Sequence, residues 1–238
     1  MSAQEKSTRV AWDPAYGGSC VGCDLRGRNM SGGNISTANY PETNLSGAFL
    51  RGTQAKNVNL TRTLAVGADF RQATLDGSKL VEGRFEGARF ERTSLLNTDL
   101  SGAIMSSAHL TGAKFGGATA TEADFSNAHA SGADFSGANL TGAIFIGATL
   151  RDAQFNNAIV LGVSFANADL RNARLTNLRL LDVDFEGASG VEQAVFDGSC
   201  VGAGTWLPDS VRLVTCQLLS VPDSLELMGG AVQTADKN

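Results

Sequence analysis

The sequence has few of the residues and segments that mark membrane proteins and most enzymes. Its 238 residues include only 4 Pro, 2 His, 2 Trp and 2 Tyr. No apolar run reaches the roughly 18 residues that a transmembrane helix needs, so we expect no membrane span. Residues 1–6 lack the apolar centre of a secretory signal peptide. We therefore expect a cytoplasmic protein, with a periplasmic or secreted location as the alternative if a signal peptide has been removed.

Catalytic motifs are missing as well. The chain contains no glycine-rich phosphate loop that opens a helix and no G-x-S-x-G nucleophile elbow. Its two histidines, His109 and His129, are expected to stack on one outer surface, where a solvated pair is favoured over a shared metal ion. The sequence predicts no catalytic residue, no metal site and no cofactor, and therefore a protein that is not an enzyme.

What the sequence does have is a period of five. Every residue from Leu25 to Phe185 whose number ends in 0 or 5, called a core position below, is apolar, although only 42% of the whole chain is apolar. All Phe residues except Phe49 and Phe196 occupy core positions. Two residues earlier, at the small positions whose numbers end in 3 or 8, more than half of the residues are Ala. Chance does not produce such a register.

A period of five fits neither a helix, which repeats near 3.6 residues, nor a strand, which repeats at about 2. A short fixed repeat is typical of a solenoid, whose units must stack to bury an apolar face. Core and small positions then point inward, and the other three positions face water. Gly is frequent at the corner positions, whose numbers end in 2 or 7, because it accepts the positive φ of a sharp turn.

Individual repeats identify the kind of solenoid. Residues 133–137 (ADFSG), 138–142 (ANLTG) and 168–172 (ADLRN) resemble the pentapeptide-repeat consensus A(D/N)LXX. This resemblance covers about residues 20–190 and implies an all-β solenoid, a right-handed quadrilateral β-helix with four pentapeptides in each coil. About eight coils, stacked roughly 4.8 Å apart, would make a rod on the order of 40 Å long.

The ends of such a rod must be covered, because a solenoid exposes β-edges there. We expect residues 1–19 to form an N-terminal cap, residues 20–190 the repeat region and residues 191–238 a C-terminal cap. No Pro-rich or charged linker interrupts the register.

With twenty residues in each coil, core residues form ladders along the rod. One predicted ladder contains Phe85, Met105, Phe125, Phe145, Phe165 and Phe185, and a second contains Phe115, Phe135 and Phe155. Small residues beside them leave room for the rings in each layer. Arg28 at a small position, and Ala55 and Ala65 at core positions, predict looser packing in the first coils.

Four cysteines lie toward the two ends, as Cys20-x-x-Cys23 and as Cys200 and Cys216. The resemblance places the two pairs about 40 Å apart, which excludes a zinc site made from all four. Cys20 and Cys23 occupy a core and a small position, which favours a role as small core residues. Disulfides are the alternative, and they would favour an oxidising compartment.

The segment after residue 190 is more apolar than a solvated tail needs. It contains Trp206, Leu218 and Leu219, and a near-duplicate in which residues 207–213 (LPDSVRL) are followed by residues 221–227 (VPDSLEL). Each Pro-Asp-Ser is expected to open a turn or a short helix. An end cap is the favoured interpretation. A homodimer interface is the alternative, since some members of the resembling family dimerise through C-terminal elements.

Two groups of outward residues are candidate interfaces. Apolar side chains gather at outward positions toward the C-terminal end, which is typical of a protein interface. They are Ile144, Ile146, Ile159, Leu161 and Leu181. One outer face, called the arginine face, has core residues from Met30 through Phe70 and Phe90 to Leu170. It carries Arg51, Arg71, Arg89, Arg92, Arg151 and Arg171.

The neighbouring outer face, whose core residues include Phe85, Phe125, Phe145 and Phe165, is called the acidic face. It carries Asp24, Glu86, Asp124, Asp184 and Glu186 against Arg26 and Arg84. The rod is therefore expected to have a mildly basic and a mildly acidic side.

These features predict a non-enzymatic interaction or scaffold protein that presents flat faces to a protein partner. The resemblance supplies the alternative: some pentapeptide-repeat proteins bind DNA gyrase or topoisomerase IV as mimics of duplex DNA. Mimicry needs a strongly negative rod, because the enzyme's DNA-binding surface is basic. A net charge of -5 and an arginine-rich face make this chain a weak mimic. No direct binding to nucleic acid is expected.

Overall fold

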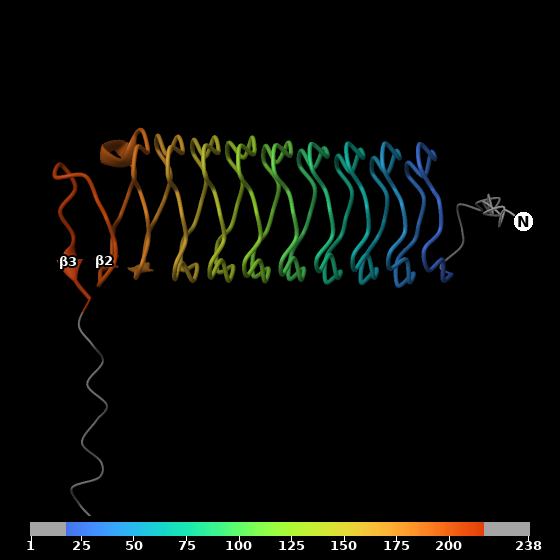
Figure 1. Cartoon of the computed structure of the whole chain (residues 1–238), viewed down its shortest axis with the longest axis horizontal. Coiled ribbons are helices and arrows are strands. Elements are labelled where there is room, and N and C mark those ends of the chain that lie inside the picture. The colour runs from blue at the N-terminus through green and yellow to red at the C-terminus, as the bar shows by residue number, and fades with distance from the viewer. Residues whose placement is uncertain (1–17, 217–238) are drawn as a thin grey trace, which may run out of the picture.

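The structure is a computed structural model that describes residues 18–216. These residues form a row of closely stacked coils (Figure 1). Within this range the regular elements are β1 (Arg179–Leu180), the single 3-10 turn η1 (Val191–Gln193), β2 (Cys200–Val201) and β3 (Val214–Thr215). None of the described residues belongs to a helix that is long and apolar enough to cross a bilayer.

Each coil takes twenty residues. Parallel β-bridges join outer residues of successive coils, for example Asn39 and Asn59. The N–H of a core residue donates to the following coil, as Leu60 N does to Lys79 O at 2.7 Å, and the N–H just before it donates to the preceding coil, as Asn59 N does to Ala38 O at 2.9 Å. The structure is thus an all-β solenoid with four pentapeptides in each coil. The hand of the winding and the number of coils stay predictions.

The chain turns at every fifth residue. Every residue from Gly22 to Gly187 whose number ends in 2 or 7 has a positive φ, between 53° and 68°. About half of these corners are not Gly, and Asn, which tolerates this region, is frequent among them. Even the β-branched Thr37 adopts a φ of 62°. The corner geometry is therefore imposed by the stacked fold, and Gly is only the least strained residue for it.

Core positions point inward, as the period of five predicts, and their side chains are buried from Leu25 to Phe185. Rings of one ladder stack face to face: the centroids of Phe125 and Phe145 lie 4.8 Å apart. Ladders half a coil apart meet edge to face, as Phe125 and Phe135 do at 5.7 Å. Both arrangements are favourable for aromatic pairs. The two predicted phenylalanine ladders are confirmed.

The small positions hold a set of internal hydrogen bonds that sequence analysis missed. Where a small position carries Thr or Ser in place of Ala, its hydroxyl donates to a core residue's carbonyl in the preceding coil. Thr53 donates to Met30 O at 2.9 Å, and Thr93 to Phe70 O at 2.7 Å. The same bond is made by Thr43, Thr63, Ser78 and Thr98. A buried hydroxyl without an acceptor would be costly, so the coil supplies one.

The first coils contain the predicted departures from the pattern. Ala55 and Ala65 lie fully buried at their core positions, and Arg28 is half-buried at its small position. Looser packing of these coils stays a prediction. Cys20 and Cys23 pack half-buried against the core and also form a disulfide, with their Cα atoms 5.5 Å apart. Both predicted roles, as small core residues and as a disulfide pair, are therefore found for these two cysteines.

The twenty-residue register ends after Ser189. Beyond it, Cys200 pairs with Arg179 on one side and with Val214 on the other, so β1, β2 and β3 form a parallel sheet in that order at the end of the rod (Figure 1). A second disulfide joins Cys200 to Cys216, with a Cα–Cα distance of 4.8 Å.

The first Pro-Asp-Ser opens a turn, as predicted, because Val211 N donates to Pro208 O at 2.9 Å. The second, in residues 221–227, lies outside the described residues. The limits of both caps stay predictions.

Replacing Phe135 with Ala should lower the free energy of unfolding by about 3–5 kcal/mol, because it removes a ring that stacks on Phe115 and Phe155 and leaves a cavity. Chemical denaturation measures the change. Phe49→Ala is the control: that side chain is 50% exposed, and its loss should cost less than about 1 kcal/mol. Equal effects of the two substitutions would contradict the inward position of the ladder.

Candidate interaction surfaces

Charged side chains on the outer faces are paired across single pentapeptides. The residues just before and just after a core position point to the same outer face, so opposite charges at these two positions meet. Such pairs join Asp24 to Arg26, Asp69 to Arg71, Arg84 to Glu86, Arg89 to Glu91 and Asp169 to Arg171, at N···O distances from 2.5 to 2.9 Å. Part of the surface charge is therefore neutralised within single pentapeptides.

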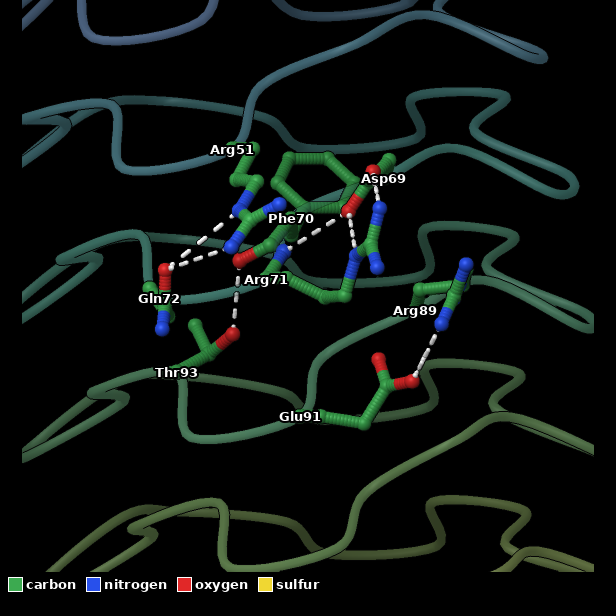
Figure 2. A network of polar contacts seen from close by, with 8 residues as sticks. All are labelled: Arg51, Asp69, Phe70, Arg71, Gln72, Arg89, Glu91 and Thr93. Atoms are coloured by element: carbon green, nitrogen blue, oxygen red, sulfur yellow. Dashed lines mark hydrogen bonds and ion pairs between the residues drawn. The ribbon is translucent and has the colours of Figure 1, made fainter.

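Figure 2 shows the part of the arginine face where two ion pairs lie on neighbouring coils. In one pair the acid precedes the arginine along the chain, and in the other the arginine precedes the acid. Arg71 Nε and Nη2 donate to the two carboxylate oxygens of Asp69, at 2.8 and 2.5 Å. Arg89 Nε and Nη2 donate to Glu91 Oε1, at 3.2 and 2.9 Å. The side-chain hydrogen bond from Arg71 lowers the pKa of Asp69, and the partial burial of this carboxyl opposes the shift without cancelling it.

Beside this network the arginine face is hollowed. The hollow has a volume of about 290 Å³ and is lined by Arg51, Arg71, Gln72, Glu91, Arg92 and Thr111. Arg51 Nε and Nη2 both reach Gln72 Oε1 at 3.4 Å, which is long for a hydrogen bond (Figure 2). Neither Arg51 nor Arg92 has a carboxylate partner among residues 18–216. Glu91 Oε2 is buried without a hydrogen-bond partner in the same range.

Nearer the C-terminal end of the arginine face, one carboxylate holds two arginines. Arg151 Nε donates to Asp169 Oδ2 at 2.5 Å, and Arg171 Nε and Nη2 donate to Asp169 Oδ1 and Oδ2 at 2.9 and 2.7 Å. The hydrogen bond from Arg171 is the main reason why the pKa of Asp169 lies well below its usual range, and the bond from Arg151 adds to it. Of the six predicted arginines, four are thus paired with carboxylates.

Arginines neutralise part of the negative charge of the acidic face. Asp24 is paired with Arg26, and Glu86 with Arg84. Asp124 accepts a hydrogen bond from the backbone N–H two residues later, at 2.8 Å. The same turn is made by Asn29, Asn44, Asp134, Asn139 and Asp184. Sequence analysis missed this role, although Asp or Asn immediately before a core position is its signal.

Four apolar side chains form an exposed cluster, called the apolar patch. Ile144, Ile146, Ile159 and Leu161 are 36%, 43%, 55% and 43% exposed. Ile144 and Ile146 lie on the acidic face, and Ile159 and Leu161 lie on the face that precedes it along the chain. Ser164, which is bridged to Ile144, comes three residues after Leu161. The two halves of the patch therefore lie on adjoining faces of neighbouring coils.

The other predicted interface residues differ from one another in exposure. Leu181 is only half-exposed, because its Cδ2 lies against Gly202, which has no side chain to displace it. Trp206 is 50% exposed and is bridged to Asp184, on the same column as Ile144. Leu218 and Leu219 lie outside the described residues.

The two histidines stack as predicted. The ring centroids of His109 and His129 lie 5.1 Å apart on the arginine face. Within residues 18–216, no group of three or more His, Cys, Asp or Glu side chains is arranged to hold a metal ion. Nothing in that range points to catalysis.

Replacing Asp169 with Asn should destabilise the fold by about 0.5–1 kcal/mol at neutral pH, because the amide keeps the size of the side chain but loses the charge that holds Arg151 and Arg171. Folding lowers the pKa of this carboxyl, so its contribution is complete above the unfolded pKa, near pH 4, and is lost as the pH falls below it. Denaturation at a series of pH values should show a constant difference from wild type from pH 7 down to about pH 5, and a shrinking difference below it.

Asp152→Asn is the matched control, because Asp152 is exposed on the same face and makes no ion pair within the described residues. Its effect should be small at every pH. If the cost of Asp169→Asn did not change with pH, the carboxylate would not stabilise the fold through its charge.

Comparison with known proteins identifies the repeat. A family model of pentapeptide repeats, in 8 copies, matches residues 56–92, 84–119, 121–157 and 148–189. No curated protein gives a significant match. Together the four matched segments span more than half of the chain.

HetL, a pentapeptide repeat protein involved in heterocyst differentiation regulation from the cyanobacterium Nostoc sp. strain PCC 7120, is 22% identical over 81% of this chain and 90% of its own, with a TM-score of 0.36. Trypsin-treated QnrB1, a plasmid-mediated fluoroquinolone resistance protein, is 19% identical over 77% and 89%, with a TM-score of 0.44. A pentapeptide repeat protein from the thylakoid lumen of Arabidopsis thaliana is 22% identical over 68% and 73%, with a TM-score of 0.26. The family match and the five-residue register of the coils agree, and the chain belongs to the pentapeptide repeat family.

Proposed function

We propose that this protein is a non-enzymatic interaction module and that the apolar patch is its docking surface for a protein partner. The observation that carries the proposal is the exposure of Ile144, Ile146, Ile159 and Leu161 on adjoining faces. Contiguous exposed apolar surface is uncommon on monomeric proteins and marks interaction sites.

Covering one large aliphatic side chain contributes about 1.5–3 kcal/mol relative to leaving it in water. Since each residue of the patch is already partly covered by its neighbours, the gain for each is a fraction of this amount. Four such residues on one rigid rod still supply a substantial apolar centre for an interface, and a rigid rod loses little conformational freedom on binding.

The double variant Ile146→Asp with Leu161→Asp tests the patch, since it places a charge in each half. Association is measured by light scattering for self-association and by quantifying each protein that a tagged chain captures. We expect the variant to lose its specific partner. Leu64→Asp with Val66→Asp is the matched control: these residues are 39% and 43% exposed and lie on the acidic face, nearer the N-terminal end.

The control variant should retain the partner. If the patch variant keeps every association of the wild type, or if both variants lose the same partner equally, the apolar patch is not the docking surface. Circular dichroism melts of both variants check that the coils remain folded.

A second copy of the chain is one candidate for the partner. Self-association through the C-terminal segment would involve Trp206, whose ring is half exposed, together with Leu218 and Leu219 beyond the described residues. Light scattering of the wild type distinguishes this arrangement from a heterologous complex.

DNA mimicry directed at a type II topoisomerase is the alternative function. It is favoured by the rod shape and by the carboxylates of the acidic face. Against it, Asp24 and Glu86 are neutralised by Arg26 and Arg84, so the acidic face offers less negative potential than duplex DNA does.

A supercoiling assay with purified gyrase, with and without a quinolone, tests the alternative. We expect neither inhibition nor protection at micromolar protein, because the unpaired negative charge is too small to compete with DNA. Inhibition of supercoiling, or relief of quinolone inhibition, would replace the interaction-module proposal with mimicry.

The compartment is also a proposal. The sequence favours the cytoplasm, whereas the disulfides Cys20–Cys23 and Cys200–Cys216 are typical of proteins in oxidising compartments. The disulfides shift our preference toward an oxidising compartment.

A further inference from the structure

The hollow on the arginine face collects positive charge that the fold does not neutralise. Three guanidiniums, those of Arg51, Arg71 and Arg92, line it together with one carboxylate, that of Glu91. Outside the hollow, Arg71 is paired with the carboxylate of Asp69, and Glu91 is paired with the guanidinium of Arg89 (Figure 2). The charges of these two partners cancel, so they leave the net charge of the group unchanged. The group therefore has an excess of about two positive charges at one place on the surface.

Elsewhere on the same face, two arginines share one carboxylate. Arg151 and Arg171 lie on one column in neighbouring coils, and the carboxylate of Asp169 bridges them. Arg51 and Arg71 occupy the same column in two earlier neighbouring coils. There, however, the carboxylate is bound to Arg71 alone, and Arg51 turns instead to the neutral Gln72. The hollow thus contains arginines arranged like those that hold Asp169, but no carboxylate is bound to Arg51.

We propose that this hollow binds a phosphate group, held by the guanidiniums of Arg51, Arg71 and Arg92. A phosphate monoester carries about −1.5 to −2 charges at neutral pH, which matches the excess charge of the hollow. A carboxylate has two oxygens, and two arginines suffice for it at Asp169. A phosphate has at least three free oxygens, which a third guanidinium can bind together with the amide of Gln72 or the hydroxyl of Thr111.

The size and the existing contacts of the hollow are compatible with this ligand. A volume of about 290 Å³ lies at the lower end of the range for ligand sites, so the hollow takes a phosphate group while the rest of the ligand lies on the surface. To bind it, Arg51 exchanges two 3.4 Å contacts with a neutral oxygen for charge-assisted hydrogen bonds. The carboxylate of Glu91 opposes phosphate binding by charge repulsion, and the three guanidiniums outweigh it.

The phosphate site lies on a different face from the apolar patch. It therefore does not rest on the proposed docking function, and either can fail without the other.

Titration of the full-length protein with inorganic phosphate, phosphoserine and acetate at constant low ionic strength tests the proposal. Arginine Nε–Hε signals in ¹H–¹⁵N spectra report the binding residue by residue. We expect saturable shifts at Arg51 and Arg92, and affinity for phosphate about fivefold or more above that for acetate. Arg51→Gln and Arg92→Gln should each weaken phosphate binding by about fivefold or more, and Glu91→Gln should strengthen it.

Arg151→Gln is the matched control, because it removes the same charge from the same column but from an arginine that Asp169 already holds. It should change phosphate affinity by less than about twofold. Binding of phosphoserine above inorganic phosphate would support a phosphorylated chain as the source, and the reverse would support the free ion. No saturable binding, equal affinity for acetate, or an equal loss in Arg92→Gln and Arg151→Gln would each overturn the proposal.

Discussion

The structure depends on one backbone constraint: the chain enters the left-handed region of φ at every fifth residue. Unlike a helix, which tolerates such a residue only at its end, this fold requires one in each pentapeptide from Gly22 to Gly187. For a residue other than Gly the conformation costs free energy. The cost is offset because each corner returns the chain to the same four-sided path, where the coils before and after it accept and donate backbone hydrogen bonds.

The regular stacking of the coils then determines which neighbours each outer side chain can contact. A residue has one neighbour across its own core position and others one coil away on either side, at about the spacing of β-strands. Short ion pairs such as Asp69–Arg71 follow from the first relation, and the stacked rings of His109 and His129 follow from the second. The inward positions obey the same geometry, which is why a Thr hydroxyl at a small position finds a carbonyl in the coil before it.

The proposed interaction surfaces are regions where side chains lack such neighbouring partners. Several acidic side chains are paired with an arginine, which reduces the negative charge of the rod relative to that of a duplex. The apolar patch exposes aliphatic side chains to solvent, and in the hollow Arg51 and Arg92 have no carboxylate partner within the described residues. The two regions lie on different faces of the stacked coils, so a ligand bound at one leaves the other accessible.

The sequence by itself determined the solenoid and the inward direction of the core positions, because these follow from a period that repeats over short stretches of chain. The grouping of residues into columns came from the resemblance to the pentapeptide repeat family, which implies four pentapeptides in each coil. It also separated the arginine face from the acidic face. Only the tertiary structure decided that both cysteine pairs are bonded, that Leu181 is covered at Gly202, and which of the arginines have partners. The physical reason is that Arg51 and Arg151 have carboxylates at the same sequence distance, Asp69 and Asp169, but each long side chain adopts a conformation set by its neighbours in adjacent coils. Gln72 accepts from Arg51, whereas the equivalent position for Arg151 is Asn172.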